Sequence, residues 1–171
     1  MIEIRNVSRT FDGKVAVDSL TLKINPGSIF ACVGPNGAGK TTTIRMLIGL
    51  LLPTTGTISV CGHDIVADAV RAKRHVGYIP DQPFLYDKLT AREFMTFVGK
   101  IYLMEPSAIQ RKIDEFAELF EMTPYLDELC ESHSHGMKQR VVLSAALMHD
   151  PRVIVVDEPM VGLDPAGARL V

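Results

Sequence analysis

The sequence of 171 residues is poor in cysteine and shows no excess of basic residues. Its three cysteines, Cys32, Cys61 and Cys130, are odd in number, lie far apart and form no C-x-x-C pair. This pattern indicates reduced, mostly buried thiols in a cytosolic protein. Because the formal net charge is −2, a general nucleic-acid binder, which would carry a basic excess, is disfavoured.

Long apolar runs are also missing. No run approaches the roughly 18 residues that a membrane-spanning helix needs, and the longest candidate, MLIGLLL at 46–52, ends at Pro53. The opening MIEIRNVSRTF is mixed and charged, so we expect no signal peptide. If the protein works at a membrane, another chain must supply the part that crosses it. The hydrophobic fraction of 47% is ordinary for one globular domain.

Three glycines, one lysine and three threonines lie within one stretch, VGPNGAGKTTT at 33–43. Its three glycines allow the backbone to turn, including through positive φ. Such a loop directs successive N–H groups toward one centre and forms an anion nest. The residues that follow predict a helix over 39–51, whose N-terminus would add free donors and a positive dipole end.

The spacing Gly34-x4-Gly39-Lys40-Thr41 is that of a P-loop. Lys40 would place a mobile ammonium over the outer phosphates of a nucleotide, and Thr41 would offer a hydroxyl to Mg²⁺. A glycine-rich turn with a chance lysine is the alternative. The complete spacing between an apolar run and a helix favours the P-loop.

Alternating and continuous apolar runs predict strands. We expect strands at residues 2–8, 17–24, 28–34, 57–62 and 75–80. The run SIFACVG at 28–34 is continuous, which is typical of a strand buried on both faces. A further apolar run, VIVVDE at 153–158, predicts a buried strand that ends in two carboxylates.

Helical patterns occupy most of the second half. We expect helices over 64–74 and 135–150, and an all-helical insertion between about 88 and 130. Within the insertion, apolar residues recur at three- and four-residue spacing with charges between them. They are Ile109, Ile113, Phe116 and Phe120.

The two carboxylates at the end of VIVVDE complement the P-loop. Asp157 would hold Mg²⁺ directly or through water, and Glu158 would orient or deprotonate the water that attacks the γ-phosphate. The alternative is an acidic turn after a core strand. The P-loop earlier in the chain favours the catalytic interpretation.

Over its whole length the chain resembles the ATPase domains of the ATP-binding-cassette (ABC) family. GPNGAGKTT is similar to their Walker A motif, VIVVDEP to Walker B, HSHGMKQR at 133–140 to the signature motif and VGLDP at 161–165 to the D-loop, with Asp164 as its acid. The resemblance implies an α/β fold, a P-loop NTPase sheet core with an N-terminal antiparallel β subdomain and an all-helical insertion. Residues 1–80 and 136–171 would form the ATP-binding core, and 81–135 the helical subdomain.

The resemblance also implies a set of site residues. Phe11 would stack on adenine, while Ser134 and Gly136 would form a second anion site that faces the nucleotide of the opposite subunit in a head-to-tail dimer. The ATP-binding residues would be Phe11, Gly34, Pro35, Asn36, Gly37, Ala38, Gly39, Lys40, Thr41, Thr42, Ser134 and Gly136. Glu158 and Lys40 would be catalytic. Mg²⁺ would be held by Thr41, Asp157 and either Asp81 or Gln82.

The sequence departs from the family pattern in three places. Asp81 followed by Gln82 stands where the family's Q-loop usually has a glutamine, and either residue could serve. His135 replaces the first glycine of the signature. The sequence stops at Val171, before the helix, strand and switch histidine that follow the family's D-loop, so we expect an incomplete cassette in which central strands lack partners.

Three functions remain open. The first is the ATP-hydrolysing subunit of an ABC transporter, cytoplasmic and peripheral at the inner face of the cell membrane, docked on a separate transmembrane permease subunit. The second is an ABC ATPase outside transport, and the third a nucleotide-binding remnant without turnover. We expect little ATPase activity from the 171-residue form alone, and no nucleic-acid partner.

Overall fold

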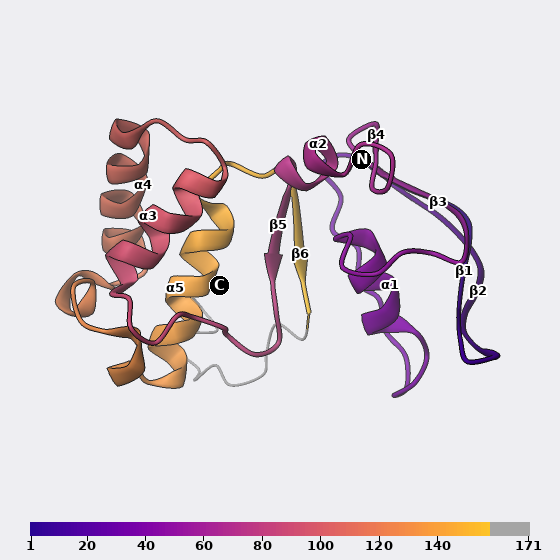
Figure 1. Cartoon of the computed structure of the whole chain (residues 1–171), viewed down its shortest axis with the longest axis horizontal. Helices are drawn as coiled ribbons and strands as arrows, with labels where there is room; N and C mark the ends of the chain where they lie inside the picture. Colours follow the sequence, from indigo (N-terminus) through magenta and orange to yellow (C-terminus); the bar gives the residue numbers. More distant parts are fainter. Residues whose placement is uncertain (158–171) are drawn as a thin grey trace. The chain divides into compact units, whose positions relative to one another are not determined.

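The computed structural model describes residues 1–157. The chain divides into two compact units, Met1–Val76 and Gly77–Val171, and each is described by itself. Figure 1 shows the antiparallel strands of the first unit and the helices of the second. Among residues 1–157, no helix has both the length and the apolar character that crossing a bilayer requires.

The first unit is built on a four-stranded antiparallel sheet in the order β2-β1-β3-β4. Its strands are β1 Ile2–Phe11, β2 Lys14–Ile24, β3 Thr55–Val60 and β4 His63–Asp64. Alternation at the start of β1 buries Ile2 and Ile4, as the period of two in the sequence predicts. Val7 is also buried, but it follows a shift in the pairing between Ile4 and Val7, where Asn6 has a φ of 47°. The hairpin between β1 and β2 turns at Asp12 and Gly13, which both have positive φ.

Helix α1, Lys40–Leu47, packs against β2 and β3 and buries Met46 and Leu47. It is shorter than the predicted helix over 39–51. Gly49 adopts a φ of 68°, and the Leu50 N–H donates to the Arg45 carbonyl at 2.9 Å. A glycine in the left-handed conformation ends a helix in this way, so the predicted extension to residue 51 is wrong.

The predicted buried strand at 28–34 is also wrong. These residues belong to neither sheet of the described chain. Ile29 and Val33 have relative exposures of 103% and 91%. A strand needs partners for its N–H and C=O groups, and none of the described strands pairs with this segment.

Helix α2, Ala69–Arg74, covers only the second half of the predicted helix over 64–74. The Asp64 side chain accepts hydrogen bonds from the N–H groups of Val66 and Ala67, at 2.8 and 2.9 Å. An aspartate side chain that accepts hydrogen bonds from N–H groups two and three residues later favours a turn over a helix. Helix α2 therefore starts later than predicted.

The second unit combines a two-stranded sheet with a helical cluster. Strands β5 Val76–Ile79 and β6 Val153–Val156 lie side by side and run in the same direction (Figure 1). The helices are α3 Ala91–Ile101, α4 Pro106–Leu119 and α5 His135–Leu147, with short 3-10 turns at Thr123–Tyr125 and Cys130–Ser132. The predicted periodicity is confirmed, since Ile109, Ile113, Phe116 and Phe120 are all buried in the core shared by these helices.

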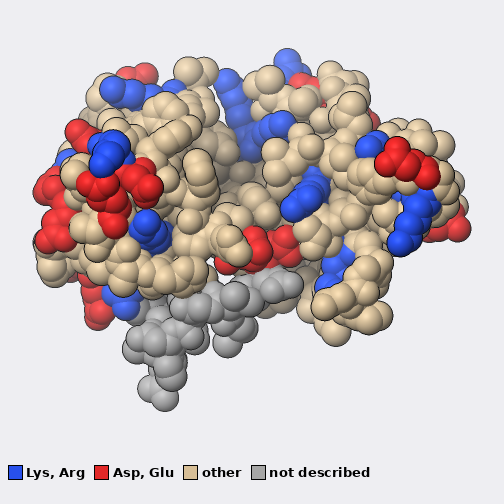
Figure 2. Space-filling model, turned by 60° about the horizontal axis from the view of Figure 1, so that its bottom comes forward, with Lys and Arg blue, Asp and Glu red and all other residues tan. Residues whose placement is uncertain are grey.

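Helix α3 begins with a capping box. The Glu93 N–H donates to Thr90 Oγ1 at 3.1 Å, and the Thr90 N–H donates to Glu93 Oε2 at 2.9 Å. On the surface of the helical cluster, acidic and basic side chains are interspersed (Figure 2). Several of them form ion pairs, as in Arg92–Asp127 at 2.7 Å.

The three cysteines are free, but the expectation of mostly buried thiols is wrong. Cys130 is buried, Cys61 is partly exposed and Cys32 is exposed. The exposure of Cys32 has the same cause as that of its neighbours, because the segment 28–34 lies outside both sheets.

Candidate functional site

The loop from Gly34 to Gly39 curls around the end of the Lys40 side chain. Lys40 Nζ donates to the carbonyl oxygens of Gly34 at 2.7 Å and Pro35 at 3.0 Å. The Ala38 N–H donates to the Pro35 carbonyl at 3.2 Å and closes a turn over Asn36 and Gly37. The ammonium is therefore held by the loop that the sequence predicts to cradle phosphates.

Two glycines give the loop its shape. Gly37 and Gly39 both have a φ of 83°, in the region that glycine occupies without strain. A Cβ on Gly39 would lie 2.5 Å from the Ala16 carbonyl oxygen and 3.1 Å from Val17 Cγ2. Gly39 thus lets the loop rest directly on β2, whereas a Cβ on Gly37 would meet nothing within 4 Å.

Helix α1 starts immediately after this loop. Gly39 is its N-cap, and neither a side-chain cap nor an acidic residue occupies its first turn. The first N–H groups of a helix, here those of Lys40, Thr41 and Thr42, have no acceptor within the helix. With the dipole at the same end, these donors suit an anion such as a phosphate.

Phe11 lies at the last position of β1 and is 41% exposed. The guanidinium carbon of Arg9 lies 4.5 Å from the centre of its ring. The hairpin that carries Phe11 is the one on which the P-loop rests, since Arg9 pairs with Val17 across the two strands. Phe11 and the loop therefore belong to one packed region of the first unit.

Arg9 is a residue that the sequence analysis missed. A signal was present, because residues two apart on a strand share one face, and an arginine on the same face as an exposed aromatic forms a cation–π pair. The sequence-based prediction named Phe11 as the residue that stacks on adenine and did not include Arg9.

In the second unit, Asp157 follows β6 directly. Its N–H donates to the Ile79 carbonyl at 3.0 Å, and the residue is 9% exposed. Asp81 and Gln82 follow β5 in an exposed loop. Because β5 and β6 run in the same direction (Figure 1), the three residues follow the carboxyl ends of neighbouring strands. Glu158 and the D-loop residues, including Asp164, lie outside the described residues.

The signature segment forms the start of α5. Ser134 is its N-cap and accepts a hydrogen bond from the Met137 N–H at 3.3 Å. His135 and Gly136 occupy the first turn, where a Cβ on Gly136 would meet nothing within 4 Å. The Ser134 side chain occupies the Met137 N–H. The N–H groups of His135 and Gly136 have no acceptor within the helix and suit an anion. His133 is buried with its ring edge-on to Tyr125 at 5.1 Å.

The family profile described as "ABC transporter" matches residues 17–161. An uncharacterized ABC transporter ATP-binding protein of Bacillus subtilis, YhcH, is 38% identical over 99% of this chain and 54% of its own length. The Nod factor export ATP-binding protein I of Cupriavidus metallidurans is 34% identical over 100% of this chain and 56% of its own length. The chain therefore spans about half the length of the curated relatives it matches.

Solved structures of ATP-binding cassettes are also similar to this chain. The ATP-binding subunit of an ABC transporter superposes with a TM-score of 0.92 and 30% identity, over 99% of this chain and 70% of that chain. A dimeric ATP-binding cassette bound to ADP and Pi shares the fold, with a TM-score of 0.88 and 24% identity over 99% of this chain and 79% of that chain. With the profile match extending from β2 beyond β6, the chain belongs to the ABC transporter family.

Proposed function

We propose that this chain is the ATP-binding and ATP-hydrolysing part of an ABC transporter subunit that powers a separate membrane subunit. The P-loop carries the proposal. Its glycines hold the backbone in the left-handed conformation, its lysine lies within the loop, and its helix begins without a side-chain cap. These groups provide donors and positive charge for a triphosphate.

The donors of this loop fit ATP by their chemistry. In the described structure Lys40 donates to two carbonyl oxygens, which are weaker acceptors than phosphate oxygens. A charge-assisted hydrogen bond to phosphate would replace them. The N–H groups at the start of α1 would bind the same phosphates. Phe11 would stack on the adenine ring.

The proposed magnesium ligands are all oxygen donors, which is the ligand type that Mg²⁺ prefers. Thr41 stands at the start of α1, whereas Asp157 follows β6 with Asp81 or Gln82 after the neighbouring strand. When bound, Mg²⁺ would neutralise charge on the outer phosphates. Thr41 and Asp157 would hold the ion, and the choice between Asp81 and Gln82 stays open.

Turnover would need residues beyond the P-loop. Glu158 is proposed to orient and deprotonate the attacking water. Ser134 and Gly136, at the start of α5, would bind the γ-phosphate held by a second copy in a head-to-tail dimer. Residues 81–135 would form the helical subdomain, and 1–80 with 136–171 the ATP-binding core.

The names of two relatives support a proposal for the partner. Because two are named for Nod factor export and linearmycin resistance, we propose export through a transmembrane permease subunit. The protein would be cytoplasmic and peripheral at the inner face of the cell membrane. Nucleic acid is not a proposed partner, since the net charge is −2.

A second candidate is nucleotide binding without turnover. One observation favours it. Residues 28–34, which lead into the P-loop, lie outside both sheets and are exposed. A loop reached through an unpaired segment can bind phosphate, but it is less rigidly placed for positioning a water molecule.

The test compares Lys40→Ala with Lys100→Ala, a control on the exposed end of α3. Calorimetric titration with ATP and Mg²⁺ should show roughly tenfold or greater weakening for Lys40→Ala, because a charge-assisted contact is lost, and no change for the control. Unchanged affinity in Lys40→Ala would refute the P-loop assignment. Phosphate release separates the two candidates, since steady turnover that Glu158→Gln abolishes would exclude the second.

A further inference from the structure

We infer that Arg9 is a positioning residue that holds the Phe11 ring in place as the platform for the nucleotide base. The inference rests on the proposed ATP binding and extends it to a side chain that the family motifs do not include. It starts from the cation–π pair at the end of β1, where the guanidinium carbon lies 4.5 Å from the ring centre.

Two contacts hold the Arg9 guanidinium, one with a carbonyl oxygen and one with the Phe11 ring. Its Nη1 donates to the Leu52 carbonyl at 3.0 Å, and Leu52 lies in the segment that follows α1. Its Nε atom is buried, with no hydrogen-bond partner among the described residues. A planar guanidinium bound at one edge and stacked over a ring has little rotamer freedom left. The Phe11 ring is therefore fixed relative to the end of the P-loop helix.

The backbone beneath the ring is held independently. The Thr10 N–H donates to Thr54 Oγ1 at 3.1 Å, and the Thr54 N–H donates to the Ser8 carbonyl at 2.8 Å. These bonds tie the end of β1 to the start of β3 without using the Arg9 side chain. Removing the guanidinium should therefore release the ring and leave the strand in place.

The platform has a direct route to the P-loop. Arg9 pairs with Val17 in the hairpin, and a Cβ on Gly39 would lie 3.1 Å from Val17 Cγ2. The strand pair that carries Arg9 and Phe11 is thus in contact with the loop proposed to hold the phosphates. A base stacked on Phe11 and a phosphate on the loop would belong to one ligand.

The two faces of the ring then have different roles. Arg9 covers one face of the ring, and Phe11 as a whole is 41% exposed. A base would stack on the other face, where aromatic stacking contributes to affinity for any base because each has a π-face. Arg9 should therefore affect the part of the affinity that depends on the base, and leave the part that depends on phosphate unchanged.

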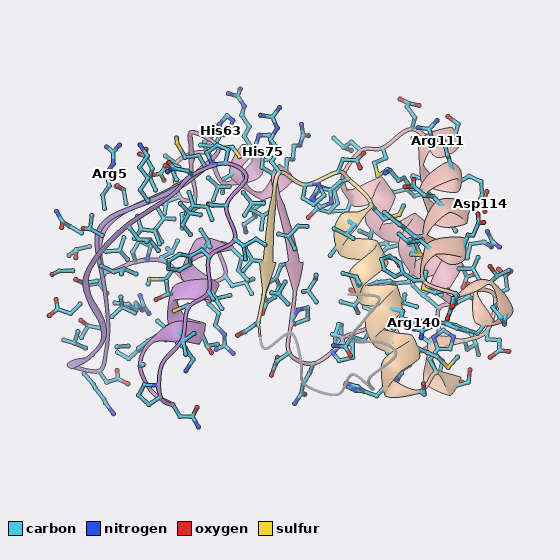
Figure 3. All side chains as sticks on the ribbon, turned by 180° about the vertical axis from the view of Figure 1, so that it is seen from behind. Arg5, His63, His75, Arg111, Asp114 and Arg140 are labelled. Carbon is cyan, nitrogen blue, oxygen red and sulfur yellow. The ribbon has the colours of Figure 1, made fainter. Side chains whose placement is uncertain are left out.

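The experiment measures binding of ATP and of inorganic tripolyphosphate to the full chain by calorimetry. It uses Arg9→Gln, Phe11→Ala and their double variant. Arg5→Gln is the matched control, because Arg5 lies on the same strand, projects from the ribbon (Figure 3) and pairs with Glu3 at 2.6 Å. We expect Arg9→Gln to weaken ATP binding about two- to tenfold. Tripolyphosphate binding should not change, and Arg9→Gln should have no further effect when Phe11 is already alanine.

Three results would overturn the inference and leave the proposed function in place. The first is unchanged ATP affinity in Arg9→Gln, and the second is an equal loss for ATP and tripolyphosphate, which would place Arg9 in the phosphate site. A wild-type chain that binds neither compound would overturn the proposed function, and this inference with it. Melting curves of Arg9→Gln and Arg5→Gln show whether the first unit stays folded, and the third contradicting result is an equal loss of ATP affinity in these two variants.

Discussion

Alanine at Gly39 and alanine at Gly37 should differ in stability although both residues have the same φ of 83°. In the left-handed region each alanine costs about 1–2 kcal/mol. Each also loses less chain entropy on folding than glycine, and this gain is the same at both sites. The pair therefore isolates one variable, which is the space around the added Cβ.

That space is available at Gly37 and absent at Gly39. A Cβ on Gly39 would lie 2.5 Å from the Ala16 carbonyl oxygen, and nothing lies within 4 Å of one on Gly37. A backbone oxygen cannot rotate away as a side chain can, so the loop must separate from β2. Overpacking of this kind costs about 1–3 kcal/mol, which is the expected difference in the free energy of unfolding between the two variants.

Urea unfolding followed by circular dichroism measures this difference, and thermal melting gives a second estimate. For a chain of this size about 1–3 kcal/mol corresponds to a difference of roughly 2–12 °C in melting temperature. Gly39→Ala should also bind ATP more weakly than Gly37→Ala, because its loop is displaced. Equal unfolding midpoints in the two variants would refute the contact between the P-loop and β2.

Three further predictions concern the second unit and the thiols. Thr90→Ala should lower the free energy of unfolding by about 1 kcal/mol through loss of the α3 cap, and an unchanged urea midpoint would contradict this. Burial raises the pKa of Cys130, so alkylation at pH 8 should label Cys130 only after unfolding. Cys32 is exposed and should be labelled rapidly in the folded protein. Equal labelling rates for the two thiols would be evidence against the described core. Arg92 lowers the pKa of Asp127 through its hydrogen bond. This interaction should stabilise the fold above the unfolded-state pKa, near 4, and be lost as pH falls through the lower folded value. In Arg92→Gln, an Asp127 pKa by NMR that fails to rise would contradict this assignment.

The elements with local signals were predictable. The period of two at residues 2–8 gave β1, and the spacing from Ile109 to Phe120 gave the buried face of α4. The P-loop could be recognised because its spacing and its helix are contiguous in the chain. Each of these patterns depends on interactions between residues close in sequence.

The errors have a different origin. Whether 28–34 forms a strand depends on partners elsewhere in the chain, and apolarity alone does not supply them. The end of α1 shortly before Gly49 and the late start of α2 after Asp64 depend on single residues that override helical periodicity. The pairing of Arg9 with Phe11 could be inferred from their spacing on one strand. The hydrogen bond from Arg9 to the Leu52 carbonyl could not, because the two residues are far apart in sequence.

The exposure of the segment 28–34 has a consequence for how the chain behaves at high concentration. SIFACV contains no charge and no proline, and it is rich in residues that favour strands. Its exposed Ile29, Phe30 and Val33 side chains, beside unpaired backbone groups, make it a template for pairing with the same segment of another copy. The apparent molecular mass from light scattering should therefore rise with protein concentration, and Val33→Lys should suppress this rise more than a lysine substitution at a well-packed surface position.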